Sequence, residues 1–500
     1  MSLLLRASAD DQSAQQQAVV TLTLGIFFDG TGNNALNARS SLETGGPAPE
    51  DSEALAAWRQ AAKQTLGFRD SALGSHIGHY TNIHRLHSLY ATDLAGGQSQ
   101  QRLYIDGIGT EAGAADRALN MAFGTGSRGI VAKTNKAVAA LVEALRNYAI
   151  RQPNLVINEL QFDLFGFSRG AAAARHFANR VFNGDSALIE AIERGLEGVE
   201  YRGSPAGKTR FLGLFDTVAA VATLANGLNP NSADSGDVNL ALRPGVAEKV
   251  FHLTAQHECR FNFALNSVRP AWPEVALPGA HSDIGGGYHA VEQESCFLTR
   301  PQFETVSLST PDEETRVYRA ASKALEALRG YPAIAPYVDN GEVEIRSWFD
   351  DRMPADRYGM LQKRSGAAAV LRRTVRNDWA KVALRVMMEA ARAAGVVFTA
   401  IDEADQALAL PDKLLPLCDK ALALSHAARH GREAVGFSEE EIALLAADYL
   451  HCSANWNEVQ TDADGNIIHA VRPVEQGAFV NRPDNRWRRT VYDLNGKKMT

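Results

Sequence analysis

Hydrophobic and polar positions along the first 288 residues predict strands separated by helices. Short apolar runs that end at glycine or polar residues predict buried strands, and longer runs with a helical period predict helices. The predicted strands are residues 19–28, 101–106, 155–165, 210–215, 250–254 and 275–280. The predicted helices are residues 55–66, 81–90, 130–148 and the alanine-rich stretch after residue 170. This order is typical of a mostly parallel α/β sheet with helices on both faces.

The pattern changes after residue 288, where helical periods follow one another without clear parallel strands between them. The helices predicted there are residues 315–328, 367–394, 414–430 and 439–450. We therefore expect a catalytic core over residues 18–299, a large helical cap inserted over residues 300–452, and an extended segment over residues 453–500 that packs on the core. Residues 1–17 are polar and are expected to be frayed.

The most informative stretch joins the third predicted strand to the alanine-rich helix. It reads Gln-Phe-Asp-Leu-Phe-Gly-Phe-Ser-Arg-Gly over residues 161–170 and contains the pattern Gly-x-Ser-x-Gly. Between a strand and a helix, this pattern is typical of a nucleophile elbow, a sharp turn that exposes a serine hydroxyl at the edge of the sheet. Gly166 and Gly170 permit the close backbone approach that such a turn needs. We interpret Ser168 as a nucleophile rather than as part of an ordinary strand-to-helix turn.

A serine hydroxyl becomes a good nucleophile only when a base removes its proton, and an acid must orient that base. Two downstream strands end in suitable residues, Asp216 after residues 210–215 and His281 after residues 275–280. In a parallel sheet the carboxyl ends of the strands gather along one edge, where ligands bind. The order Ser168, Asp216, His281 is also the chain order of α/β-hydrolases. The sequence thus predicts an α/β-hydrolase fold with these residues as its triad.

Other side chains compete for the roles of acid and base. Asp216 can instead cap the segment that follows it, because Asp-Thr is a common start of a turn. Asp283 is a rival acid, His451 is a rival base, and His289 is a further rival on the same loop as His281. We rank His281 first because it ends a clear strand and is followed by glycines that let its loop approach the nucleophile.

Acyl transfer by a serine also needs two backbone donors for the oxyanion. One is expected to be the N–H of Arg169, directly after the nucleophile. The other is expected from Gly30 or Thr31, in the loop Asp-Gly-Thr-Gly-Asn-Asn that follows the first strand. The alternative is that this loop is only a turn. The Arg169 guanidinium can meet a phosphate head group, although an exposed or salt-bridged arginine is the more ordinary arrangement.

Composition narrows the classes of function. The chain of 500 residues carries a formal net charge of −7, which argues against nucleic acid as the main partner. No apolar run approaches the roughly 18 residues that span a bilayer, and the first ten residues lack the apolar core of a signal peptide. The four cysteines form no Cys-x-x-Cys pair, so we expect neither a disulfide framework nor a zinc site. We expect no cofactor.

Four motifs occur together and in order between residues 27 and 288. They are Phe-Phe-Asp-Gly-Thr-Gly-Asn-Asn at 27–34, Gly-Phe-Ser-Arg-Gly-Ala-Ala at 166–172, Leu-Phe-Asp-Thr-Val at 214–218, and Pro-Gly-Ala-His-Ser-Asp-Ile-Gly-Gly-Gly-Tyr at 278–288. This set resembles the type VI secretion lipase effectors, in the class with a Gly-x-Ser-x-Gly nucleophile and phospholipase A activity. The resemblance implies a Ser-Asp-His triad, delivery on a secretion spike, action at a lipid surface in the periplasm of a rival bacterium, and a cognate immunity protein that blocks the site.

These expectations describe an antibacterial phospholipase of the A1 type, made in the cytoplasm without a signal peptide. It would hydrolyse acyl esters of membrane glycerophospholipids through an acyl-enzyme on Ser168. Three alternatives remain open from the sequence: phospholipase A2 regiochemistry, a carboxylesterase or thioesterase for soluble acyl substrates, and a hydrolase-fold adaptor on the spike that has no activity.

Overall fold

The computed structural model describes most of the chain in several ranges. These ranges are residues 18–30, 80–92, 94, 97–107, 126–152, 154–219, 235–340, 343–456, 459–461, 467–470, 483–484 and 486–499. Three of the sequence predictions lie outside them: the frayed residues 1–17, the helix at 55–66, and Thr31 as an oxyanion donor.

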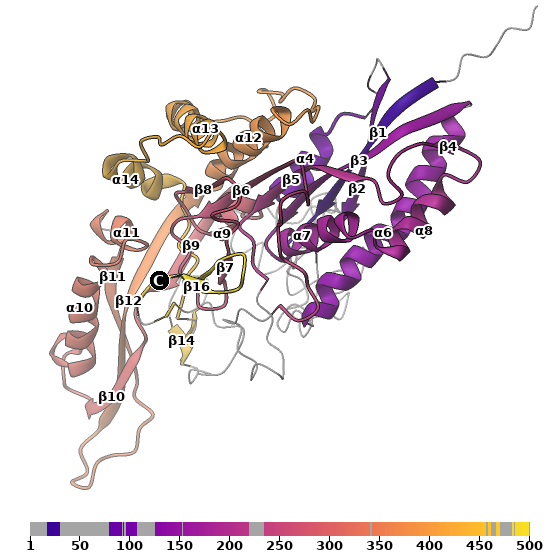
Figure 1. Ribbon diagram of the computed structural model, residues 1–500. Coiled ribbons are helices and arrows are strands. Elements are labelled where there is room, and N and C mark those ends of the chain that lie inside the picture. Colours follow the sequence, from indigo (N-terminus) through magenta and orange to yellow (C-terminus); the bar gives the residue numbers. More distant parts are fainter. Residues whose placement is uncertain are drawn as a thin grey trace, which may run out of the picture.

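Six parallel strands form the centre of the molecule (Figure 1). In the order in which they lie side by side, they are β2 (Gln98–Ile105), β1 (Ala18–Phe28), β3 (Leu155–Phe167), β5 (Lys208–Phe215), β6 (Lys249–Ala255) and β8 (Glu274–Leu277). A short strand, β4 (Glu200–Tyr201), also pairs in parallel with β3. Each of the six overlaps a strand predicted from the sequence, which confirms the α/β fold class with a mostly parallel sheet.

Helices cover both faces of this sheet. One face is covered by α6 (Gly126–Arg151), α7 (Arg169–Phe182) and α8 (Ser186–Gly195). The other is covered by α4 (Asn82–Leu89) and α12 (Asp378–Arg392). Phe27 packs in the core beneath α4 and α12, whereas its neighbour Phe28 packs in the core beneath α7. Successive residues of each strand therefore enter two separate apolar layers, which is why the strands are continuous apolar runs in the sequence.

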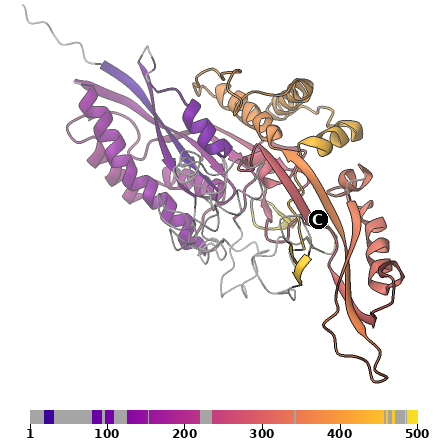
Figure 2. The same cartoon turned by 180° about the vertical axis from the view of Figure 1, so that it is seen from behind.

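Beyond residue 288 the chain forms a second, antiparallel sheet that projects away from the first (Figures 1 and 2). Its strands are β9 (Val291–Phe297), β10 (Gln302–Ser307), β11 (Val343–Asp350) and β12 (Gln362–Arg376). The accompanying helices are α10 (Arg316–Leu328), α11 (Ala335–Asp339), α13 (Leu415–Arg429) and α14 (Glu439–Asp448). The predicted helices at 315–328, 414–430 and 439–450 are confirmed.

The helix predicted over residues 367–394 is wrong in its first half, and with it the expectation of a purely helical cap. Residues 367–376 belong to strand β12, and α12 begins only at Asp378. At least one of the alanines that suggested a helix packs directly against α10. Ala367 of β12 forms an apolar cluster with Val317 and Ala321 of α10. Close packing and sheet pairing thus override the helix propensity of alanine.

The last described residues return to the carboxyl-end edge of the parallel sheet. Strand β15 (Val491–Tyr492) pairs in parallel with β7 (Leu265–Asn266), and β16 (Lys498–Met499) pairs with β15. An antiparallel hairpin, β13 (Val459–Thr461) with β14 (Ile467–Ala470), precedes them. We call residues 486–499 the distal segment. Among the described helices, none is both long and apolar enough to cross a membrane.

Candidate active site

The turn between β3 and α7 has the geometry of a nucleophile elbow. Ser168 occupies φ 58° and ψ −125°, in a part of conformational space that residues with a Cβ rarely adopt. Its backbone N–H donates to the carbonyl of Phe215 at 3.0 Å, which ties the elbow to the end of the neighbouring strand β5. The serine itself is buried. A strained backbone at this position holds the side chain at the carboxyl end of the strand.

The two glycines of the elbow are needed for steric reasons. A Cβ on Gly166 would lie 2.4 Å from the carbonyl oxygen of Gly170. A Cβ on Gly170 would lie 2.2 Å from the carbonyl oxygen of Phe28, at the end of β1. Both distances are far below van der Waals contact, so only glycine fits. The second contact also places the loop after β1 directly against the elbow.

Asp216 and His281 meet at the same edge of the sheet. Asp216 follows β5 at once with φ 44°, and His281 opens the short helix α9 (His281–Gly285) just after β8. The imidazole Nδ1 lies 2.5 Å from Asp216 Oδ2, and both side chains are buried. The ring of Phe167, the residue before Ser168, packs 4.5 Å from the imidazole ring between centroids. Three strand ends that are distant in the sequence therefore place the predicted triad residues in one region.

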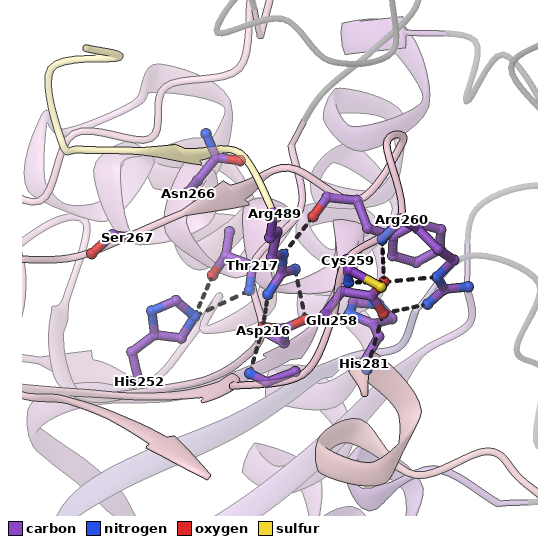
Figure 3. Close-up of polar contacts among 12 residues, drawn as sticks. Asp216, Thr217, His252, Glu258, Cys259, Arg260, Asn266, Ser267, His281 and Arg489 are labelled. Carbon is purple, nitrogen blue, oxygen red and sulfur yellow. Dashed lines mark hydrogen bonds and ion pairs between the residues drawn. The ribbon is translucent and has the colours of Figure 1, made fainter. Parts of the chain in front are cut away.

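Sequence reasoning missed a fourth residue of this site, Arg489 in the distal segment (Figure 3). Its guanidinium forms two hydrogen bonds to the Asp216 carboxylate, 2.6 Å to Oδ1 and 2.8 Å to Oδ2. The backbone N–H of Ala255 also donates to Oδ1, at 2.9 Å. Burial opposes ionisation of Asp216, but Arg489 and His281 hold the pKa of this carboxyl well below its ordinary value. Asp216 is thus a fixed negative charge at any physiological pH.

A second buried carboxylate supports His281 from its backbone side. Glu258 Oε2 accepts the His281 N–H at 3.2 Å and forms an ion pair with Arg260 at 2.7 Å. Burial works against the charge on Glu258, but Arg260 lowers its pKa to about 2. Burial also lowers the pKa of His281, and the hydrogen bond and charge of Asp216 offset that effect only in part. The imidazole is therefore neutral near pH 7, as a group that accepts a proton must be.

The rival residues Asp283 and His451 pair with each other instead. His451 Nδ1 lies 2.7 Å from Asp283 Oδ1, and the His451 N–H donates to Asp283 Oδ2 at 3.0 Å. The imidazole stacks on Tyr288 with ring centroids 3.7 Å apart. Burial disfavours the imidazolium, yet Asp283 and two nearby glutamates raise the pKa of His451 above its ordinary value. This pair is separate from that of Asp216 and His281, although Asp283 also belongs to α9.

Of the predicted oxyanion donors, two can be placed. Arg169 opens α7, so its N–H lies in the first turn, at the positive end of the helix dipole. The N–H of Gly30 donates at 2.7 Å to the carboxylate of Asp29. Asp29 also accepts from Thr81 Oγ1 and from Tyr104 Oη at 2.5 Å, and burial raises its pKa to about 6. The two described residues after β1, Asp29 and Gly30, are therefore joined by a hydrogen bond to that buried carboxyl group.

Comparisons with known proteins point to one family. A family model described as the catalytic domain of Tle1-like phospholipase effectors of the type VI secretion system matches residues 190–309, which include Asp216 and His281. The solved structure of the Tle1 effector bound to the VgrG spike is 40% identical, with 98% of each chain covered and a TM-score of 0.74. The chain belongs to the Tle1-like effectors.

As a Tle1-like effector, the protein is a lipid ester hydrolase delivered by type VI secretion. The crystal structure of an uncharacterized protein from Pseudomonas aeruginosa is also similar, at 18% identity over 87% of this chain and 53% of that one, with a TM-score of 0.41. A search of curated proteins finds no match.

Sequence reasoning missed two residues near the triad, Glu258 and Arg489, and the sequence signals for them differ. Glu258 and Arg260 are two positions apart, which is a local ion-pair spacing but not a signal of catalysis. Arg489 is one of three arginines in the distal segment, with Arg486 and Arg488. A cluster of arginines in an acidic chain suggests a buried carboxylate partner, but it does not show which arginine is the partner.

Proposed function

We propose that this Tle1-like effector is a phospholipase A1 whose triad is Ser168, Asp216 and His281. His281 Nε2 takes the proton of the Ser168 hydroxyl while the oxygen attacks an acyl ester carbonyl of a glycerophospholipid. The imidazolium that forms is stabilised by Asp216 and then gives its proton to the leaving lysophospholipid alkoxide. A water molecule, deprotonated by the same imidazole, hydrolyses the acyl-enzyme and releases a fatty acid.

The observation that carries this proposal is the pairing of Asp216 with His281 at the sheet edge where the strained Ser168 turn also lies. The 2.5 Å contact to Nδ1 fixes the tautomer that leaves Nε2 free of a proton. The N–H of Arg169 is proposed as one oxyanion donor. The N–H of Gly30 or Thr31 is proposed as the second, and for Gly30 this requires that its bond to Asp29 opens when substrate binds.

The biological setting is proposed from the relative. That protein was solved bound to a VgrG spike, and the likeness extends over 98% of both chains. We infer that this chain also travels on a spike protein, acts on phospholipids in the periplasm of the target cell, and is neutralised by an immunity protein in its producer. We propose a division into a core (18–299), a cap (300–452) that mixes strands and helices, and an extended segment (453–500).

Fluorophosphonate labelling followed by peptide mass spectrometry tests the nucleophile. We expect label on Ser168 of the wild-type protein and none on Ser168→Ala. The control is Ser425→Ala, which also removes a buried serine hydroxyl, here in α13, outside the proposed site. Label that persists in Ser168→Ala, or a wild-type protein that takes no label while it hydrolyses lipid, would show that the nucleophile is elsewhere.

Regiochemistry needs a second experiment. Vesicles of a phosphatidylcholine with two different acyl chains are incubated with enzyme, and the lysophospholipid is identified by mass spectrometry. Loss of the sn-1 chain supports the A1 assignment, and loss of the sn-2 chain replaces it with A2. Hydrolysis of a soluble acyl ester with no activity on vesicles would favour a soluble-substrate esterase.

A further inference from the structure

Arg489 has an unusual place in this molecule, because it reaches the proposed catalytic acid from 273 residues further along the chain. The side chain is 6% exposed and the Asp216 side chain is fully buried. Both guanidinium Nη atoms bind the carboxylate, one to each oxygen. Such a planar, two-bond contact fixes orientation as well as charge. At the proposed acid of a triad, such a contact affects both the orientation of the carboxylate and the charge beside the base.

We propose that Arg489 is a positioning residue for catalysis, which holds the Asp216 carboxylate in the orientation that His281 needs and moderates the negative charge that His281 experiences. The inference rests on the proposed triad. Arg489 touches neither the nucleophile nor the base in this proposal, and it acts only through Asp216.

The orientation argument follows from the contacts of the carboxylate. Among the described residues, removal of Arg489 would leave Asp216 Oδ1 with the Ala255 N–H and Oδ2 with His281. Asp216 also sits in a left-handed backbone conformation at a turn, with φ 44°. The guanidinium plane removes the rotation about the bond to the carboxyl group that such a short side chain retains. It thereby keeps Oδ2 directed at His281 Nδ1.

Arg489 can do this because the distal segment is itself anchored on the core (Figure 3). The Arg489 Nε–H donates to the carbonyl of Phe263 at 2.6 Å. The N–H of Leu265 donates to the carbonyl of Thr490 at 2.9 Å, in line with the pairing of β7 and β15. The Phe263 ring in turn lies edge-on to the His281 ring, with centroids 4.8 Å apart. Phe263 therefore contacts both the arginine, through its carbonyl, and the base, through its ring.

The electrostatic argument depends on all charged groups around the base. His281 is faced by Asp216, by Glu258 and by Arg260, and Arg489 is the further cation on Asp216. Glu258 is already balanced by its ion pair with Arg260. If Arg489 is neutralised, Asp216 becomes an unbalanced negative charge beside the imidazole. His281 then holds its proton more tightly and is available as a base only at higher pH.

The test compares Arg489→Gln with Arg489→Lys. For each variant, kcat/KM on phospholipid and the rate of fluorophosphonate labelling at Ser168 are measured against pH. The plateau is the maximal value of each profile, and the acid limb is its fall at low pH. For Arg489→Gln we expect a plateau about 10- to 100-fold below wild type, by analogy with residues that orient metal ligands through one hydrogen bond. We also expect the acid limb to move up by roughly one pH unit. Arg489→Lys keeps the charge but loses the fork. Its acid limb should stay at the wild-type position while its plateau lies between the other two.

The matched control is Arg210→Gln. Arg210 forms a similar two-bond contact in the same sheet, to Asp163 at 2.9 and 2.6 Å, but Asp163 lies within β3 and takes no part in the pairing of Asp216 with His281. Its loss should lower the melting temperature and leave the acid limb in place. A purely structural role of Arg489 would give this control behaviour.

The outcomes separate this inference from the triad on which it rests. Wild-type protein that is not labelled at Ser168 contradicts the triad. A second outcome contradicts the role of Arg489 but not the triad. In it, wild-type protein is labelled at Ser168, and a folded Arg489→Gln variant has the plateau and acid limb of wild type. If Arg489→Gln does not fold, Arg489→Lys still decides. Full wild-type kcat/KM in Arg489→Lys would overturn the positioning role, because its single-point charge cannot fix the carboxylate plane.

Discussion

Two buried pairs of a histidine and an aspartate each include one residue of helix α9, and locally they look alike. His281 Nδ1 is 2.5 Å from Asp216, and His451 Nδ1 is 2.7 Å from Asp283. Each imidazole also lies against an aromatic ring. By distance, burial and residue type, either pair satisfies the requirements for the base and acid of a serine hydrolase.

The charges around the pairs differ, and this difference separates their roles. Burial outweighs Asp216 and lowers the pKa of His281, and Asp216 itself also binds Arg489. His451 faces Asp283 together with the glutamates at 292 and 294, which overcome burial and raise its pKa. The surroundings thus favour the neutral imidazole at His281, the form that can accept a proton, and the protonated imidazole at His451. The acid of the first pair binds an arginine, whereas the histidine of the second pair faces further carboxylates, and this distinguishes the pairs better than the short hydrogen bond does.

The largest expected effect comes from removing each imidazole. His281→Ala should lower kcat/KM on phospholipid by up to about a millionfold, because the serine hydroxyl is inert without its base. His451→Ala should leave the activity of the folded enzyme within about tenfold of wild type, while its melting temperature falls. Enzyme assays normalised to the folded fraction measure both. An active His281→Ala beside an inactive His451→Ala would move the base to the second pair.

Next in size is the effect of neutralising each acid. Asp216→Asn should cost about ten-thousandfold in kcat, because the amide stabilises the wrong tautomer of the base. Asp283→Asn should mainly destabilise the protein, since it leaves a buried imidazolium with a weaker partner. Steady-state kinetics with a thermal melt on each variant separates the two results. Comparable losses of kcat in both would mean that the pairs act together.

Glu258, which supports the first pair, predicts a pH effect on stability. Its pKa in the folded protein is about 2, below its value of roughly 4.3 in an unfolded chain. Its contribution, about 3 kcal/mol from this difference, is therefore present above pH 4.3 and is lost as the pH falls toward 2. Urea unfolding at pH 6 and pH 3 should show Glu258→Gln much less stable than wild type at pH 6, with a smaller gap at pH 3. An equal gap at both pH values would contradict the lowered pKa.

The smallest effect is also the most direct comparison of the two histidines. Because the folded-state pKa of His451 is raised, its stabilising contribution is full below about pH 6.5 and fades as the pH rises through the folded pKa. Because that of His281 is lowered, protonation works against folding as the pH falls below the same value. Unfolding curves from pH 5 to 8 should therefore show His451→Gln most harmful at the acid end and His281→Gln least harmful there. Parallel slopes for the two variants would remove the distinction.

The sequence predicted those parts of the fold that depend on local patterns. Continuous apolar runs identify buried parallel strands, and the residues that end them, Ser168, Asp216 and His281, come to one edge because parallel strands point the same way. Strand β12 was mistaken for a helix because the packing of Ala367 against α10 is a contact with another segment, which the local pattern does not reveal. The balance of charge was also beyond sequence reasoning, since the contact of Arg489 with Asp216 and that of His451 with Asp283 join residues far apart in the chain.

The late position of Arg489 also orders events during synthesis. The ribosome makes Ser168, Asp216 and His281 long before it adds Arg489, 273 residues after Asp216. Domains begin to fold as they emerge, but a buried carboxylate without its cation is costly. Burial of Asp216 is therefore unfavourable in a growing chain until Arg489 has been added. Any translation product that stops before residue 489 would contain the proposed nucleophile, acid and base, yet lack the arginine that binds the proposed acid.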